Sequence, residues 1–291
     1  MPAANMGEKG KETVKTAGTV KRYFKGQLNH WKSFQDEVLT FWTDDQTVDA
    51  LGRCDHLPVG VDHSTVGELN PYAMYFGERI QCGGEITISG RFYSNALEHV
   101  VRCVETLGQH AGFGPKEVVF GDSWIQYVSD RVPGQQPDIL GQFRVGKNKH
   151  EVRLLGEVKF PLTVDIADMV KLVLEGDTKQ FCEILGQVVN YMLGHRLKYA
   201  FLTNYRETTF LMLHHIRTGH GTLESRIAFS NPIMFDDTVN IHQKRISVRL
   251  ALLYLIHKTG NNTNKKSKNK DDENHSWQIS ELACKVTEKW I

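Results

Sequence analysis

The chain has 291 residues, of which 40% are hydrophobic and 24% charged, and its formal net charge is +1 at pH 7. This composition is ordinary for a globular protein, and the length is sufficient for one large domain or two small ones. No uninterrupted apolar run approaches the ~20 residues of a membrane-spanning helix, so we expect no contact with a membrane. The net charge is not that of a strongly basic nucleic-acid binder, but a local basic patch would suffice.

The cysteine pattern bears on the cellular compartment. The five cysteines contain no CxxC pair and no spacing typical of a zinc site. We therefore expect reduced thiols in an intracellular protein of the nucleus or cytoplasm. The stretch from Met1 to Lys15 is polar and rich in lysine, without the apolar centre of a signal peptide.

The first 80 residues divide into two predicted regions. Residues 1–18 are small, polar and rich in Lys and Gly, which predicts a disordered arm. Residues 19–80 form a predicted helical region, because large apolar side chains recur at three- and four-residue steps between Val20 and Leu51. Three of its aromatic side chains fit either a homodimer surface or a core, namely Trp31, Phe34 and Trp42.

A strand, a helix and a second β-rich segment are predicted next. Apolar and polar residues alternate over Glu85–Ser89, which predicts a strand. The segment Ser94–Leu107 carries an apolar stripe and predicts a helix that Ser94 caps and Gly108 ends. Residues Glu117–Ser129 are rich in β-formers and predict a further strand.

Further strands and helices are predicted in the rest of the chain. Residues 137–145 and 151–160 are apolar runs joined by a polar turn, which predicts a β-hairpin. The next predicted elements are helices at Val164–Glu175 (closed by Gly176) and Thr178–Leu197, strands at Tyr199–Asn204 and Thr208–His214, a helix at 244–257, a flexible linker at 258–276 and a C-terminal amphipathic helix at 277–291. Strand runs flanked by helices predict an α/β (α+β) fold with a mixed central sheet and helices on its faces.

Three charged residues stand among the apolar residues of the predicted hairpin. Asp138 lies in Gln-Pro-Asp-Ile-Leu, and Glu157 and Lys159 lie in Leu-Leu-Gly-Glu-Val-Lys-Phe. A charge among strand-core residues is costly unless it is paired or binds a metal. Carboxylates that converge are hard oxygen ligands suited to Mg²⁺ or Mn²⁺, and a neighbouring lysine completes the groups that metal-assisted phosphodiester cleavage requires.

These residues and their order resemble the PD-(D/E)xK nuclease superfamily. The matching elements are Pro137-Asp138, then Glu157-Val158-Lys159, then Gln187 and Tyr191 in the QxxxY pattern of RecB-like members. The resemblance covers about residues 94–215. It implies a restriction-endonuclease-like core within a nuclease-like domain that we place at residues 81–257.

The resemblance implies a role for each residue of the hairpin. Asp138 and Glu157 would bind the divalent metal, Mg²⁺ or Mn²⁺, with the backbone carbonyl of Val158 as a third oxygen ligand. Lys159 would hold the attacking water or the scissile phosphate. Two other interpretations stay open: Asp138 can be a turn residue that starts a strand, and Glu157 and Lys159 can form a solvated face on an edge strand.

The resemblance also implies roles for residues on helices. A helix before the sheet often supplies one more acid, for which we take Glu98, with Glu105 on the same helix as the alternative. Gln187 and Tyr191 lie one helical turn apart, on the same side of their helix. In RecB-like members such residues brace the site or contact the substrate backbone, although an ordinary boundary glutamine and a core tyrosine fit the pattern as well.

The register of the hairpin decides whether the two acids meet. Side chains alternate across a strand, so Glu157 and Lys159 share one face. A tight turn centred on Asn148 would place Asp138 opposite Val158, on the wrong face. We therefore predict an irregularity near Gly141 or in the loop 146–150 that brings Asp138 level with Glu157.

Two functional hypotheses follow. The first is a metal-dependent nuclease that hydrolyses phosphodiester bonds of nucleic acid, with DNA favoured over RNA as the partner. The second is a catalytically inactive protein of the same fold that binds nucleic acid or protein as a scaffold. The presence of all three hairpin residues favours the enzyme. Substrate form, the mode of cleavage and the oligomeric state are not decided by the residues.

Overall fold

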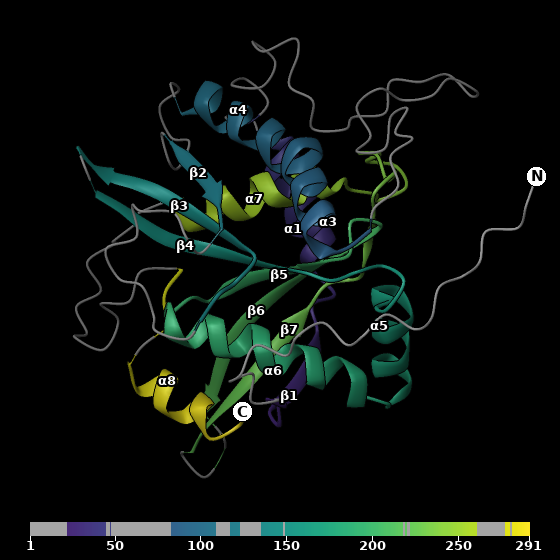
Figure 1. The fold of residues 1–291 in the computed structure, drawn as a ribbon, viewed down its shortest axis with the longest axis vertical. Coiled ribbons are helices and arrows are strands. Elements are labelled where there is room, and N and C mark those ends of the chain that lie inside the picture. The colour runs from purple at the N-terminus through teal and green to yellow at the C-terminus, as the bar shows by residue number, and fades with distance from the viewer. Residues whose placement is uncertain are drawn as a thin grey trace, which may run out of the picture.

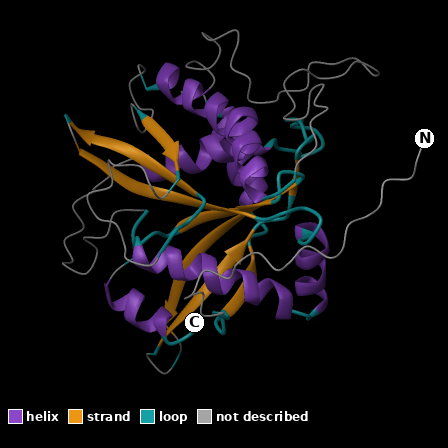
Figure 2. Cartoon of the chain, viewed as in Figure 1, coloured by secondary structure: helices purple, strands orange, loops and turns teal. Residues whose placement is uncertain are grey.

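A computed structural model describes residues 22–44, 47, 83–108, 117–122, 135–147, 149–217, 219, 222–260, 277–279 and 281–291. In this part of the chain, a mixed β-sheet of eight strands lies between two layers of helices (Figures 1 and 2). The strands are β1 (Gln27–His30), β2 (Val118–Gly121), β3 (Ile139–Gly146), β4 (Lys149–Val158), β5 (Tyr199–Thr203), β6 (Glu207–Arg217), β7 (Leu223–Phe229) and β8 (Ile233–Met234). The helices are α1 (Phe34–Thr43), α3 (Glu85–Phe92), α4 (Glu98–Leu107), α5 (Ile166–Glu175), α6 (Lys179–Gly194), α7 (Val248–Gly260) and α8 (Glu281–Glu288), with a π-helical turn η1 (Tyr93–Leu97) between α3 and α4.

The sheet has the order β1-β7-β6-β5-β4-β3-β2, with the short β8 paired to β6. Strands β4 and β5 at its centre are parallel, as are β1 and β7 at one edge, and the other pairs are antiparallel. Helices α5 and α6 make the crossover that a parallel pair requires. They lie with α8 on one face of the sheet, and α1, α3, α4 and α7 lie on the other (Figure 1).

The register of the β3–β4 hairpin is irregular near Gly141, as predicted, but this irregularity does not set the alignment of Asp138. Gly141 pairs with Leu154 but the next residue pairs with Val152, and a second, opposite shift lies between Arg144 and Gly146. Because the two shifts cancel, Ile139 pairs with Gly156 in the register that the Gly146–Lys149 pair at the turn already sets, one residue away from that of a turn centred on Asn148. The same register, continued by one residue, places Asp138 level with Glu157 rather than with Val158.

The elements that follow the hairpin agree with the sequence as far as β6, whereas β7 and β8 were not predicted. Asp165 caps α5 by accepting a hydrogen bond from the Asp168 N–H at 2.7 Å, and Gly176 ends it in the left-handed conformation at φ 104°. Helix α6 and strands β5 and β6 also occupy their predicted segments. Helix α7 extends to Gly260, so the predicted linker does not begin at Lys258, and residues 261–276 lie outside the described part.

The strand predicted at Glu85–Ser89 is wrong, because this segment is helix α3. Its buried side chains are Ile88 and Phe92, one helical turn apart, whereas Ile86 is exposed. Packing of this four-residue stripe against the core overrides the local alternation. Ser94 is likewise not a helix cap, since it lies inside the π-helical turn that joins α3 to α4.

The predicted helical region also contains a strand, because Gln27–His30 form β1 beside β7. Trp31 is 6% exposed and Phe34 1% exposed, so both belong to the core of their own chain and not to a homodimer surface. Phe34 stacks on Phe210 at 5.0 Å, and Trp42 packs partly buried against the same core. The predicted arm at 1–18 and strand residues 123–129 lie outside the described part.

Helix α1 is held to α7 by a network around Glu37. Its carboxylate accepts hydrogen bonds from Tyr254 Oη at 2.6 Å, Lys258 Nζ at 2.9 Å, Trp31 Nε1 at 2.9 Å and Ser33 Oγ at 2.8 Å. Burial alone would raise the pKa of Glu37, but these hydrogen bonds lower it to about 2. The ionised form is therefore the one that the fold stabilises.

We expect Glu37 to make the stability of the protein depend on pH in the acid range. Because its folded-state pKa lies below the ordinary value of 4.5, its contribution is complete above pH 4.5 and is lost as the pH falls toward 2. The Tm difference between wild type and Glu37→Gln should therefore shrink from pH 7 to pH 3. Asp36→Asn is the control, since its ion pair with Lys244 is exposed and should matter little at any pH. A constant Tm difference would contradict the role of Glu37.

We expect Gly186→Ala to destabilise the protein. A Cβ at Gly186 would lie 2.2 Å from the carbonyl oxygen of Arg22, so α6 and the chain before β1 must separate. The expected loss is about 1–3 kcal/mol in urea unfolding. Gly90→Ala is the control, because a Cβ there meets nothing within 4 Å and a helical alanine is favoured by up to ~1 kcal/mol. Equal stability of the two variants would show that the close approach is absent.

Candidate active site

The three charges of the hairpin meet where β3 begins and β4 ends. Glu157 Oε1 accepts a hydrogen bond from Lys159 Nζ at 2.6 Å. Asp138 Oδ2 accepts one from the backbone N–H of Val158 at 2.8 Å. The carboxyl groups of Asp138 and Glu157 are close enough for each to change the pKa of the other. The structure thus brings together the acids and the lysine that the sequence singled out.

Helix α6 adds two further predicted residues to this group. Gln187 Oε1 accepts a hydrogen bond from Lys159 Nζ at 3.3 Å, and Gln187 Nε2 donates to Tyr191 Oη at 2.9 Å. The two side chains lie one turn apart on the same side of the helix, as their spacing predicts. Tyr191 is only 8% exposed, so it supports Gln187 from within the protein.

Glu157 is the most deeply buried charged side chain of the site. Its side chain is 2% exposed, and its Oε2 atom has no hydrogen-bond partner among the described residues. Burial raises the pKa of Glu157 to about 8, against the charge of Lys159 and with help from the carboxylates of Asp138 and Glu85. A buried carboxylate oxygen without a partner is uncommon in folded proteins and indicates a place where a cation or a proton is required.

The two other charges are perturbed by the same surroundings. Burial raises the pKa of Asp138, although the Val158 N–H and the Lys159 charge oppose this. Burial alone would lower the pKa of Lys159, but Glu157, Glu85 and Asp138 raise it above its usual range. The lysine therefore stays protonated, and one ammonium faces three acids.

This donor set fits a hard divalent cation. Asp138 and Glu157 supply carboxylate oxygens, and Glu157 Oε2 is unpaired. The N–H and C=O of a strand residue point to the same neighbour, so the Val158 carbonyl faces the Asp138 side as well. In the described part no three His, Cys, Asp or Glu side chains surround one metal position. Mg²⁺ and Mn²⁺ usually keep several water ligands and are bound through one or two carboxylates.

Glu98 does not join this group. It forms an ion pair with Arg102 at 2.5 Å on the exposed side of α4. The acid that interacts with all three hairpin charges is Glu85, in the first turn of α3. The two glutamates are 13 residues apart along nearly continuous helix, which is about 20 Å at 1.5 Å per residue. Sequence reasoning missed Glu85 because its segment was predicted to be a strand.

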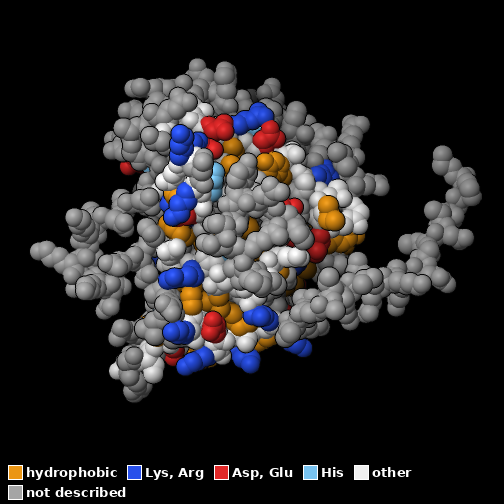
Figure 3. All heavy atoms as spheres, turned by 60° about the vertical axis from the view of Figure 1, so that its left-hand side comes forward, with side chains coloured by type: hydrophobic (Ala, Val, Ile, Leu, Met, Phe, Trp, Pro, Cys, Tyr) orange, Lys and Arg blue, Asp and Glu red, His pale blue; other side chains and the backbone are white. Residues whose placement is uncertain are grey.

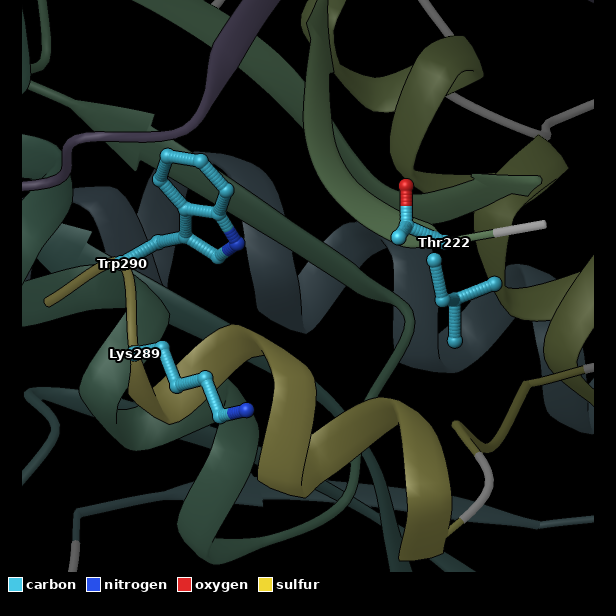
Figure 4. A pocket seen from close by; sticks show the side chains of 4 residues that line it. Thr222, Lys289 and Trp290 are labelled. Atoms are coloured by element: carbon cyan, nitrogen blue, oxygen red, sulfur yellow. The ribbon is translucent and has the colours of Figure 1, made fainter. Parts of the chain in front are cut away.

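A pocket lies far from these residues. It has a volume of about 400 Å³ and is lined by Thr222, Leu223, Lys289 and Trp290, where β7 begins and α8 ends (Figure 4). Leu223 pairs with Arg217 at one end of β6, whereas the Lys159 end of the sheet lies at the other. Nine residues of strand separate these ends by about 30 Å, so the pocket is not part of the charged group.

Comparisons of the chain with protein-family models, with curated proteins and with solved structures found no match. The resemblance to the PD-(D/E)xK superfamily therefore rests on the residues and their arrangement. Among the described helices, none combines the length and apolar character needed to cross a membrane.

We expect Glu157→Gln to change stability in a pH-dependent way. Because the folded-state pKa of Glu157 is raised, its ionisation weakens the fold of the metal-free protein as the pH rises from 4.5 to about 8. The Tm advantage of Glu157→Gln in EDTA should grow over this range. Saturating Mn²⁺ should raise the Tm of wild type and not of the variant.

Glu183→Gln, on the exposed side of α6, is the matched control for this experiment. Its Tm should follow that of wild type at every pH, with and without Mn²⁺. A Glu157→Gln variant that behaves like the control would show that the Glu157 carboxylate is neither costly nor a ligand.

Proposed function

We propose that this chain is a divalent-metal-dependent nuclease that hydrolyses phosphodiester bonds, with DNA favoured over RNA. The observation that carries the proposal is the buried Glu157 carboxylate, which has an unpaired oxygen beside Asp138 and Lys159. Such a group is costly unless a cation completes it. Two carboxylates and a lysine at one point are what metal-assisted cleavage of a phosphodiester requires.

Each residue of the site has a distinct role in this proposal. Asp138, Glu157 and the Val158 carbonyl would hold Mg²⁺ or Mn²⁺, and Glu85 takes the place expected of Glu98 at the edge of the site. When bound, the metal supplies positive charge to the phosphate oxygens and lowers the pKa of water. Lys159 donates a hydrogen bond to the scissile phosphate or to the attacking water, using an ammonium that its neighbours keep protonated.

Helix α6 positions the lysine for this role. Gln187 Oε1 accepts a hydrogen bond from Lys159 Nζ, and Gln187 Nε2 donates one to Tyr191 Oη. Because Lys159 Nζ also donates to Glu157, two partners on β4 and α6 define where its ammonium lies. A group that is held in this way needs little reorganisation when substrate binds.

The same proposal includes a restriction-endonuclease-like core. The order α4, β2, β3, β4, α5, α6, β5, β6 is the one on which the resemblance rests. The site lies at the central strands of this unit, between the hairpin and α6. Lysine and arginine side chains also gather down one face of the molecule, among a few acidic ones (Figure 3). This face supports the expected local attraction for nucleic acid.

One observation favours the alternative, a scaffold that binds nucleic acid or protein without cleaving it. Lys159 already neutralises part of the Glu157 charge at 2.6 Å, so the pair could persist without a metal. A scaffold predicts binding that is unchanged when Glu157 is replaced. The enzyme predicts a Mn²⁺-dependent activity that disappears with the same replacement.

The test is a cleavage assay on single- and double-stranded DNA and RNA with Mg²⁺, Mn²⁺ or EDTA. We expect metal-dependent cleavage by wild type, and losses on the order of 100-fold or more for Asp138→Asn and Lys159→Ala, comparable to removal of one transition-state-stabilising group elsewhere. Glu98→Gln should keep the wild-type rate and Glu85→Gln should lower it. The proposal fails if folded wild type leaves every substrate intact with both metals.

A further inference from the structure

Two large apolar side chains are unusually exposed. Ile86 is 90% exposed and Leu162 is 83% exposed, the highest values among the large hydrophobic residues of the described part. Single exposed apolar residues are ordinary in soluble proteins. These two are of interest because Ile86 directly follows Glu85 and Leu162 lies three residues after Lys159.

Ile86 directly follows Glu85 in the first turn of α3. The turn is ordered by hydrogen bonds from the Ile88 N–H to the Gly84 carbonyl at 3.2 Å and from Ser89 Oγ to the Glu85 carbonyl at 2.9 Å. The Glu85 carboxylate interacts with the three hairpin charges. The helix packs against β4, so its regular backbone holds Ile86, exposed to solvent, one residue from an acid that acts electrostatically on the site.

Leu162 approaches the site from a different element, the connection between β4 and α5. The Phe160 carbonyl accepts hydrogen bonds from the N–H groups of Thr163 at 3.0 Å and Val164 at 3.1 Å, which makes this connection a tight turn. Leu162 lies three residues after Lys159, so their Cα atoms are at most about 10 Å apart. Turn positions of this kind usually carry polar residues.

In a nucleic acid, the surfaces that exposed apolar side chains can contact are the faces of the bases. Next to each phosphodiester the nonpolar surfaces are the faces of the bases. Inside an intact duplex these faces are covered by their stacked neighbours, whereas single strands and duplex ends leave them free. Apolar side chains bind nucleic acids by contacting or separating bases in this way.

We propose that Ile86 and Leu162 contact unstacked bases beside the scissile phosphate, so that the protein prefers single strands and duplex ends to continuous duplex. The inference rests on the proposed function and extends it to the substrate class. It relies on two independent elements, α3 and the β4–α5 turn, that present apolar surface next to the same charged group.

The experiment compares wild type with Ile86→Ser, Leu162→Ser and the double variant. The controls are Leu174→Ser and Ile241→Ser, which remove apolar side chains that are 54% and 50% exposed and distant along the chain from the site residues. One sequence is offered as a single strand, as a blunt duplex and within a covalently closed circular duplex. Binding to a single strand that contains 2-aminopurine is measured by fluorescence in EDTA, where no cleavage is required.

We expect wild type to cleave the single strand faster than the closed circle. The double variant should bind and cleave the single strand on the order of 10-fold less well, as for loss of a base contact, while its rate on the closed circle stays unchanged. The control variants should match wild type. Quenching or enhancement of 2-aminopurine fluorescence should also decrease in the double variant.

Three results would overturn the inference. The first is a double variant that binds the single strand as wild type does. The second is a Tm several degrees lower, which would mean that the chain itself covers these side chains. The third is a changed oligomeric state, which would assign them to contacts between copies. If wild type cleaves nothing, the proposed nuclease fails, and the fluorescence measurement still decides whether bases are bound.

Discussion

The burial of the Glu157 carboxylate beside Lys159 is the interaction on which the site depends. A carboxylate that is 2% exposed requires compensation, and a single ammonium at 2.6 Å provides only part of it. Asp138 adds a second negative charge, and Glu85 a third within electrostatic reach. Without a cation, burial holds the pKa of Glu157 at about 8, so the acids of this group would all be ionised near neutral pH only if a cation offset their charge.

The sheet provides the rigid support for this charge. Glu157 lies near the end of β4, where the parallel partner β5 and the antiparallel partner β3 flank the strand. A Cβ at Gly156 would lie 2.2 Å from the ring of Phe201, so the aromatic ring packs directly on the backbone behind Glu157. Phe92 stacks on the same ring at 5.6 Å. This apolar packing fixes the backbone of β4 from the face opposite the site.

Stability and the site are separated in space. The hydrogen bonds around Glu37 join α1 to α7, and the buried side chains of Trp31 and Phe34 extend the core beneath them. Both carboxylate oxygens of Glu37 accept hydrogen bonds, and these lower its pKa. At Glu157 the pKa is raised and one oxygen lacks a partner. The same residue type is thus used for stability in one place and for chemistry in the other, according to its surroundings.

The sequence by itself determined the β3–β4 hairpin, helices α5 and α6 and the residues Asp138, Glu157, Lys159, Gln187 and Tyr191. These follow from local rules: capping residues, a four-residue spacing and period-two alternation, whereas the turn at Gly146–Lys149, and not the predicted irregularity, brings Asp138 level with Glu157. Tertiary structure alone decided that Glu85–Phe92 is a helix, that Gln27–His30 is a strand, and that Glu98 pairs with Arg102 while Glu85 acts electrostatically on the hairpin charges. Short segments fit either backbone conformation locally, so their tertiary partners settle which one forms. Burial of Ile88 and Phe92 favours the helix at Glu85–Phe92, and pairing with β7 favours the strand at Gln27–His30.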